Sequence, residues 1–276
     1  CRSMNRPMRD CLTITMILLL GACSSQPPAA DTHESLNAGL WIQTAAEYAA
    51  STTQAYRVAM DNLDRALGDP HWSAALEQQG DFAALPPAVL LDIDQTVLDN
   101  SGYNTQLILE NEVHTMDRFS AWCEAFAPAI PGVKPFMDHA VARGVTIIYY
   151  SARPESLRDC TARNLLEYGL PLADQALLLL NDGTSETRKA RQRRDLAGRY
   201  HILLIVGDNL DDFVSGSRDE PDARRTLAKQ HASRWGREWI ILPNPVYGHW
   251  EASVYDFDRS LSRDERVDRK LQYPSD

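Results

Sequence analysis

Asp92, Asp94 and Thr96 occupy alternate positions at the end of an apolar run, where their side chains could do acid–base or nucleophilic chemistry. Residues 88–93 are short and almost wholly apolar, which predicts a central strand of a parallel sheet. Open α/β sheets bind their ligands at the carboxyl ends of strands. Two carboxylates there are costly to bury unless they are paired, protonated or bound to a metal ion. The D-x-D-x-T pattern therefore indicates a functional site.

Three interpretations of this pattern compete. The simplest is a polar strand end at which Asp99 and Asn100 begin a loop. A calcium loop requires glycine at its sixth position and glutamate at its twelfth, but counting from Asp92 these positions hold Val97 and Tyr103. The third interpretation is an aspartyl nucleophile: one carboxylate attacks phosphorus, the other handles the proton, and Mg²⁺ offsets the negative charge.

The third interpretation resembles motif I of the haloacid dehalogenase superfamily of phosphohydrolases, and similar motifs follow in the order of that superfamily. A second buried-strand pattern, residues 144–153, reaches Ser151, where the superfamily keeps a hydroxyl that binds the phosphoryl group. A third apolar run, residues 200–207, leads into Asp208 and Asp212, which resemble the metal-binding motif IV.

Lys189 lies before that third run, within a basic stretch at residues 188–194. A charge run is usually one solvated face of a helix, and this alternative applies to every member of the stretch. Lys189 is its only lysine, and its place resembles that of the motif III lysine. The resemblance implies that Lys189 holds the transferring phosphoryl group and offsets the charge of Asp92.

Three longer segments resemble the class C non-specific acid phosphatases of the lipoprotein e type: LLDIDQTVLDNSGYN, VGDNLDDF and WIILPNPVYGHWE. These are bacterial surface lipoproteins with acid phosphatase and 5′-nucleotidase activity. The resemblance runs from about residue 41 to residue 251 and implies an α/β Rossmannoid fold with a parallel central sheet and a small helical cap. Gly102 and Ala152 depart from it, since proline and asparagine are expected at these positions.

The resemblance also implies a mechanism. Asp92 attacks the phosphorus of a monoester, and Asp94 protonates the leaving oxygen and then activates water. Asp92, the main-chain carbonyl of Asp94 and Asp208 would hold Mg²⁺, with Asp212 orienting that set from outside it. Alternatives are a phosphomutase or phosphotransferase on the same fold, and a surface lipoprotein without catalytic activity.

Substrate-binding candidates are Arg153, next to the Ser151 motif, and three aromatic side chains. Tyr247 lies in a loop just past a strand, while Tyr103 and Trp122 flank the expected cap. These rings could stack on a nucleobase, which favours nucleotides as substrates. The alternative for each ring is ordinary packing.

Residues 34–276 are predicted to form one phosphatase domain, with a cap from about 34–68 and 100–130. The charged tail after Tyr255 is expected to be peripheral. Expected helices cover 34–67, much of 104–126, a segment from 131, 154–168 and 185–199, and further strands cover 176–180 and 238–242.

The N-terminus predicts export. Residues 1–22 contain arginines, an apolar core too short to span a membrane and small residues before Cys23, as in a signal peptide. LLGAC resembles a lipobox, in which Cys23 becomes the lipidated first residue, and the alternative is an ordinary signal with a chance cysteine. Ser24 in second place favours the outer membrane. Residues 23–33 would then be a tether.

The chain has 276 residues, 44% of them hydrophobic, which suits one α/β domain. Its net charge of −10 becomes −12 without residues 1–22. A surface this acidic argues against a nucleic-acid polymer as partner, although a metal ion and Lys189 would still admit a small phosphomonoester. Cys123 and Cys160 could pair after export or remain buried thiols. No oligomeric state is predicted.

Overall fold

The computed structural model describes residues 35–110, 112–172, 176–181, 188–258 and 260–273. The chain divides into two units, 1–32 and 33–276, and only the second contains described residues. The predicted signal peptide, the tether and Cys23 lie outside them. Within the described ranges, no helix is long and apolar enough to cross a membrane.

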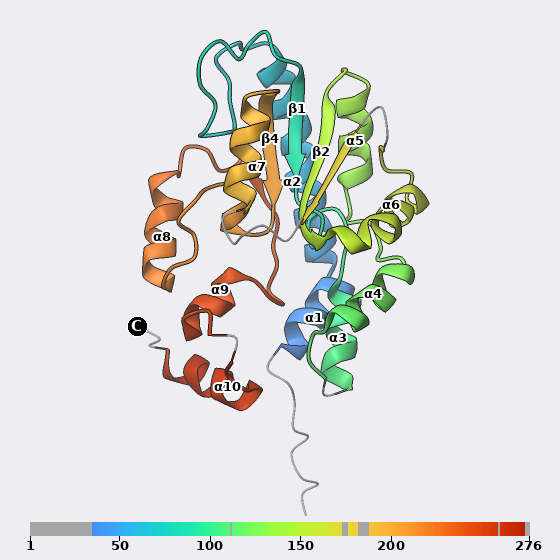
Figure 1. The fold of residues 1–276 in the computed structure, drawn as a ribbon, viewed down its shortest axis with the longest axis vertical. Helices are drawn as coiled ribbons and strands as arrows, with labels where there is room; N and C mark the ends of the chain where they lie inside the picture. Colours follow the sequence, from blue (N-terminus) through green and yellow to red (C-terminus); the bar gives the residue numbers. More distant parts are fainter. Residues whose placement is uncertain (1–34, 111, 173–175, 182–187, 259, 274–276) are drawn as a thin grey trace, which may run out of the picture. The chain divides into compact units, whose positions relative to one another are not determined.

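A parallel sheet forms the centre of the described unit, as predicted (Figure 1). The strand order is β3-β2-β1-β4-β5, so β1 lies between the two strands that carry the other acidic and hydroxyl motifs. β1 is buried on both faces, which accounts for its continuous apolar run. The strands are β1 (Pro87–Leu91), β2 (Thr146–Pro154), β3 (Ala176–Asn181), β4 (His201–Gly207) and β5 (Trp239–Ile241).

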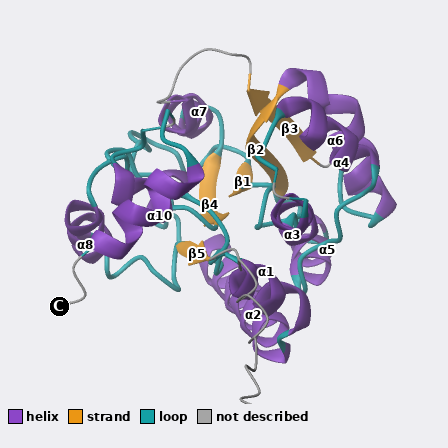
Figure 2. Ribbon diagram, turned by 90° about the horizontal axis from the view of Figure 1, so that it is seen from below, coloured by secondary structure: helices purple, strands orange, loops and turns teal. Residues whose placement is uncertain are grey.

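Helices cover both faces of the sheet (Figure 2). On one face, Val89 and Leu91 of β1 pack in the core that includes Leu63 of α2 and Phe136 of α5. On the other face, Leu90 packs in a core with residues of α7 and of the loop after β4. The helices are α1 (Leu36–Thr44), α2 (Ala46–Leu67), α3 (Ser101–Leu109), α4 (Met116–Glu124), α5 (Val133–Val141), α6 (Arg158–Glu167), α7 (Arg188–Ala197), α8 (Pro221–Gln230), α9 (His249–Ala252) and α10 (Arg263–Gln272).

The segment 34–68, which the sequence predicts to be part of the cap, divides between two places. α1 contacts α3, where the amide of Gln43 donates to Thr105 Oγ1 at 2.8 Å. α2 instead lies on the sheet, and the hydroxyl of its Tyr56 donates to the carbonyl of Thr96 at 2.7 Å. Its row of buried residues makes α2 a layer of the central domain, because that row continues the core under β1.

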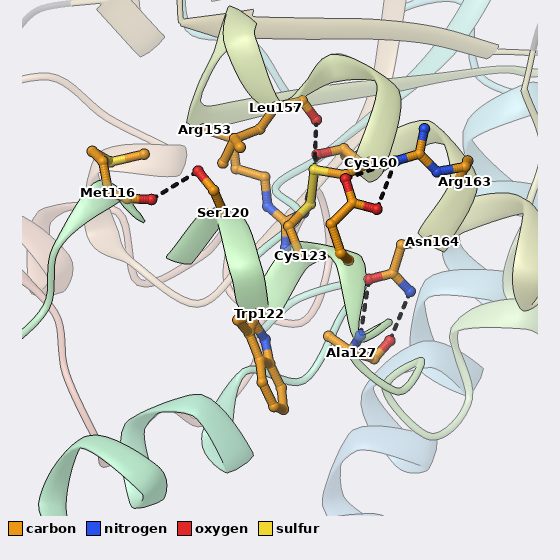
Figure 3. The surroundings of a disulfide bond; sticks show 12 residues. Met116, Ser120, Trp122, Cys123, Ala127, Arg153, Leu157, Cys160, Arg163 and Asn164 are labelled. Carbon is orange, nitrogen blue, oxygen red and sulfur yellow. Dashed lines mark hydrogen bonds and ion pairs between the residues drawn. A yellow bond between two sulfur atoms is a disulfide. The ribbon is translucent and has the colours of Figure 1, made fainter. Parts of the chain in front are cut away.

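Cys123 of α4 and Cys160 of α6 form a disulfide, which decides between the two alternatives that the sequence left open (Figure 3). The exposed pair Arg163–Glu124 joins the same two helices. The tail is peripheral as expected, since α10 has no buried residue.

Candidate active site

The chain turns sharply where β1 ends, and the turn presents Asp92 and Asp94 to a cavity. Asp92 is still in the sheet, because its N–H donates to the carbonyl of Val206 at 3.0 Å. Gln95 then adopts a positive φ of 56°, which non-glycine residues seldom adopt. Its buried side chain accepts a hydrogen bond from the N–H of Asn100 at 2.5 Å and so fixes the turn.

The second acidic motif is shaped by a close approach at the end of β4. A Cβ on Gly207 would collide with the carboxyl group of Asp212, so only glycine fits this position. Asp212 is fully buried, and its Oδ2 accepts from the N–H of Asn209 at 2.9 Å. The hydroxyl of Tyr150 donates to the main-chain carbonyl of Asp212 at 2.5 Å. Two hydrogen bonds, one to its carboxyl group and one to its main-chain carbonyl, therefore fix Asp212.

Asp92, Asp208 and Asp212 each place a carboxylate oxygen within 4.8 Å of the others. Burial raises the pKa of Asp208 well above its usual range, and the charges of Asp212 and Asp92 raise it further. Burial also raises the pKa of Asp92, although Lys189 opposes that shift. One ammonium group among three carboxylates, of which Asp92 and Asp212 are buried and Asp208 is half-buried, leaves the cluster short of positive charge. Its oxygen donors and this deficit fit a hard divalent cation.

Lys189 is buried in the site, so the solvated-face alternative does not describe it. Its Nζ lies 2.7 Å from Asp92 Oδ1, contacts Asp212 Oδ1 and lies 5.0 Å from the ring centre of Tyr150. Burial acts to lower the pKa of Lys189, but Asp212 and Asp92 outweigh it and hold that pKa well above its usual range. Lys189 is therefore a fixed positive charge beside Asp92.

Asp94 is not part of this cluster and has its own partners. Arg153 Nη2 lies 2.8 Å and Nε 3.0 Å from Asp94 Oδ1, while the amide of Asn100 donates to the same oxygen at 2.5 Å. Ser151 Oγ lies 3.5 Å from Asp94 Oδ2 and is fully buried. Unlike Arg153, Ser151 is not among the residues that line the cavity.

The cavity in front of these groups has a volume of about 830 Å³. Tyr103 and Tyr247, two of the predicted substrate-binding residues, line it, together with Phe119, which the sequence did not indicate. Trp122 does not line it: its ring packs against the core and its indole N–H donates to Asn100 Oδ1 at 2.9 Å. Phe119 lies three residues before Trp122, nearly one helical turn, so both rings were candidates on the same helix and no sequence signal separated them.

Asn100 was also missed. Its side chain bonds Asp94 and Trp122, and it contacts the side chain of Tyr247 as well. Only its position soon after the D-x-D-x-T pattern pointed to it. One departure from the resemblance has a local explanation, because a Cβ on Gly102 would lie 2.8 Å from the Trp122 ring; the other, Ala152, lines the cavity.

Comparison with known proteins agrees with this arrangement. The family model of the HAD superfamily, subfamily IIIB (acid phosphatase) matches residues 10–250. Two structures of the class C acid phosphatase from Bacillus anthracis, one with tungstate bound, superimpose with a TM-score of 0.77. They are 29% and 30% identical over 88% of this chain and 97% of theirs.

A human protein, ubiquitin carboxyl-terminal hydrolase 28, is 31% identical over 78 residues. That match spans 28% of this chain and only 7% of the human protein, so it carries no argument about function.

The chain therefore belongs to subfamily IIIB of the haloacid dehalogenase superfamily, the acid phosphatases. It is similar to the class C enzymes over most of its length, which identifies it as a phosphomonoesterase. Membership of a phosphatase family favours hydrolysis over the phosphomutase alternative and catalysis over a purely structural role.

Proposed function

We propose that this phosphatase is Mg²⁺-dependent and hydrolyses phosphomonoesters, 5′-nucleotides among them, through a phosphorylated Asp92. The observation that carries the proposal is the position of Asp92, which contacts Lys189 Nζ at 2.7 Å and shares a carboxylate cluster with Asp208 and Asp212. Asp92 is the only one of these acids that both belongs to the carboxylate cluster and comes directly from β1.

In the first step, a carboxylate oxygen of Asp92 forms a bond to phosphorus while the bond from phosphorus to the ester oxygen breaks. Asp94 gives its proton to that departing oxygen. Lys189 offsets the charge that gathers on the phosphoryl oxygens. In the second step, Asp94 takes a proton from water, the water oxygen bonds to phosphorus, and the acyl phosphate separates into free phosphate and Asp92.

Mg²⁺, held by Asp92, Asp208 and the main-chain carbonyl of Asp94 with Asp212 beside them, would supply the missing positive charge. Positive charge in the cluster favours the carboxylate form of Asp92, and a nucleophile needs that form. Lys189 alone leaves the pKa of Asp92 above its usual value.

The nucleotide preference is supported by the rings of Tyr103, Phe119 and Tyr247 around the cavity. A volume of about 830 Å³ suits a ligand the size of a nucleoside, since small-molecule pockets usually span about 300–1,000 Å³. The aromatic rings could stack on the base while the acidic end holds the phosphoryl group.

The mechanism is tested with p-nitrophenyl phosphate, a nucleoside 5′-monophosphate and glycerol phosphate, each assayed with Mg²⁺ and with EDTA. We expect activity with Mg²⁺, loss in EDTA and no activity in Asp92→Asn. In Asp94→Asn, p-nitrophenyl phosphate should still phosphorylate the enzyme, because its leaving group needs no proton, but hydrolysis should stall. Mass spectrometry of the acid-quenched variant should then find one phosphoryl group on the peptide that contains Asp92. Full activity in Asp92→Asn would refute the mechanism.

We also propose, from the sequence alone, that lipid on Cys23 anchors the mature protein to the outer membrane. Cys23→Ser should be recovered in the soluble fraction, whereas the parent chain should remain with outer membranes after a salt wash. Equal membrane retention of the two proteins would place the anchor elsewhere.

A further inference from the structure

The guanidinium group of Arg153 is enclosed by the chain. Its side chain is 1% exposed. Nε and Nη2 contact the carboxyl group of Asp94, while Nη1 donates to Thr161 Oγ1 at 3.0 Å and lies 3.7 Å from Cys123 Sγ. These contacts engage four of the five N–H groups of an arginine. Arg153 therefore has little capacity left for a substrate, although the sequence placed it among the substrate-binding residues.

The walls around Arg153 come from two helices. Phe119 of α4 lies against the guanidinium, with its ring centre 5.3 Å from Cζ. Thr161 of α6 accepts a hydrogen bond from the opposite end of the group. The Cys123–Cys160 disulfide joins these same two helices, and Figure 3 shows the Arg153 side chain running beside it. The bond thus fixes the spacing between the two surfaces that enclose Arg153.

We propose that Arg153 is a positioning residue that holds the carboxyl group of Asp94 toward the leaving oxygen, and that the Cys123–Cys160 disulfide keeps Arg153 in place. This inference rests on the proposed function, in which Asp94 is the acid. The other contacts of Asp94 come from the neutral side chains of Asn100 and Ser151. Arginine adds a charge-assisted contact through two nitrogens, which fixes orientation as well as distance.

Lysine cannot reproduce this contact, because its ammonium group lacks the planar fork and could not reach Asp94 and Thr161 together. Arg153→Lys therefore keeps the charge but loses the orientation. If orientation matters for proton donation, the loss will depend on how much the leaving group needs a proton. An alkoxide needs protonation much more than p-nitrophenolate does.

The decisive measurement is kcat/KM of Arg153→Lys with glycerol phosphate and with p-nitrophenyl phosphate, because kcat/KM reports the step in which the ester bond breaks. General acid catalysis typically contributes about 10²–10⁴-fold. We expect the glycerol phosphate value to fall at least about 10-fold more than the p-nitrophenyl phosphate value, with little change in KM. Equal losses with a raised KM for both substrates would show that Arg153 binds the phosphoryl group, and would overturn the proposal.

The role of the disulfide is tested with the double variant Cys123→Ser/Cys160→Ser. We expect the same dependence on leaving group, smaller than in Arg153→Lys. Glu124→Gln is the matched control, because it removes the exposed Arg163–Glu124 pair between the same helices without touching Arg153. Glu124→Gln should keep the parent's ratio of kcat/KM for glycerol phosphate to kcat/KM for p-nitrophenyl phosphate. A parent ratio in the double serine variant would show that the disulfide only stabilises the fold.

Thr161→Val removes the hydrogen-bond acceptor of Arg153 Nη1 and keeps the side chain nearly the same shape. This variant tests the same contact if the double serine variant does not fold. It should reproduce the dependence on leaving group, and a parent ratio in this variant would count against the proposal. The activities of the parent enzyme and of Asp92→Asn distinguish a failure of the proposed function from a failure of the Arg153 inference. If the parent hydrolyses neither substrate, or if Asp92→Asn stays active, the proposed function fails. If the parent is active and Asp92→Asn is not, the Arg153 ratios alone decide this inference.

Discussion

At the scale of single residues, Tyr247 contacts both the cavity and a side chain that positions Asp94. Its ring lines the cavity, and its hydroxyl interacts with the side chain of Asn100, which in turn bonds Asp94. Burial raises the pKa of the Tyr247 hydroxyl well above its usual value, so this hydroxyl stays protonated. A substitution at this position can therefore affect base binding, the position of Asp94, or both.

These effects can be separated by substrate. Tyr247→Ala should lower kcat/KM for a nucleoside 5′-monophosphate about 5- to 150-fold more than for glycerol phosphate, because one base stack is worth about 1–3 kcal/mol. Tyr247→Phe keeps the ring and should keep the parent ratio of kcat/KM for the two substrates. Trp122→Phe should keep it too, since Trp122 lies outside the cavity lining. Equal losses for both substrates in Tyr247→Ala would mean that the ring only supports its loop.

At the scale of elements, α7 carries Lys189 and Arg193 one helical turn apart. Arg193 is fully buried, and its Nη1 donates to the main-chain carbonyls of Asp211 at 2.8 Å and Asp212 at 3.1 Å. Its Nε pairs with Glu77 at 3.0 Å. One helix thus supplies the charge beside Asp92 and also secures the loop after β4.

Loss of the Arg193 contacts should destabilise the folded state. Arg193→Met should lower the free energy of unfolding by about 3–5 kcal/mol, because it leaves the carboxylate of Glu77 without its partner. Adding Glu77→Gln should recover part of the loss. Urea unfolding of the two variants measures both values. If Arg193→Met loses less than about 1 kcal/mol, the pair and its carbonyl contacts contribute little, as is typical of surface pairs.

The strands and helices were easier to predict from the sequence than the surfaces against which they pack. The runs that became β1, β2 and β4 are apolar because both faces of the sheet are covered, so the central strands and the residues at their ends followed from the sequence. The place of α2 did not, because an amphipathic helix shows which face is buried but not what covers it. The same limit applies to Trp122 and Phe119. Both are aromatic residues on α4, and only the packing shows which of them reaches the cavity.

At the scale of the whole molecule, a metal ion bound by the carboxylate cluster would stabilise the folded state. Mg²⁺ at 100 times its dissociation constant should raise the free energy of unfolding by about 2.7 kcal/mol and raise Tm accordingly. Asp208→Asn should abolish this shift, whereas Asp222→Asn, in an exposed pair with Arg225, should not. Thermal unfolding with Mg²⁺ and with EDTA provides the comparison. An undiminished shift in Asp208→Asn would place the ion elsewhere.

The disulfide should also contribute to global stability. It joins residues 37 apart, and the entropy of closing such a loop in the unfolded chain corresponds to about 4 kcal/mol. Reductant should therefore lower the Tm of the parent but leave the Tm of Cys123→Ser/Cys160→Ser unchanged. An unchanged parent Tm, with the bond shown to be reduced by thiol titration, would contradict this expectation.

The strand order also sets the width of the site. β2, β1 and β4 are neighbours, so Ser151 within β2 and Asp208 directly after β4 belong to strands that are two strand spacings apart, or about 9.6 Å. A hard divalent cation held by Asp92 and Asp208 would take up part of that width. The remaining width would hold one tetrahedral group beside Asp92. A site this narrow would select its substrate by the size of the phosphoryl group. We expect it to accept a terminal phosphomonoester and to exclude a phosphodiester, because the second ester arm of a diester would have to enter the space beside β2 or β4.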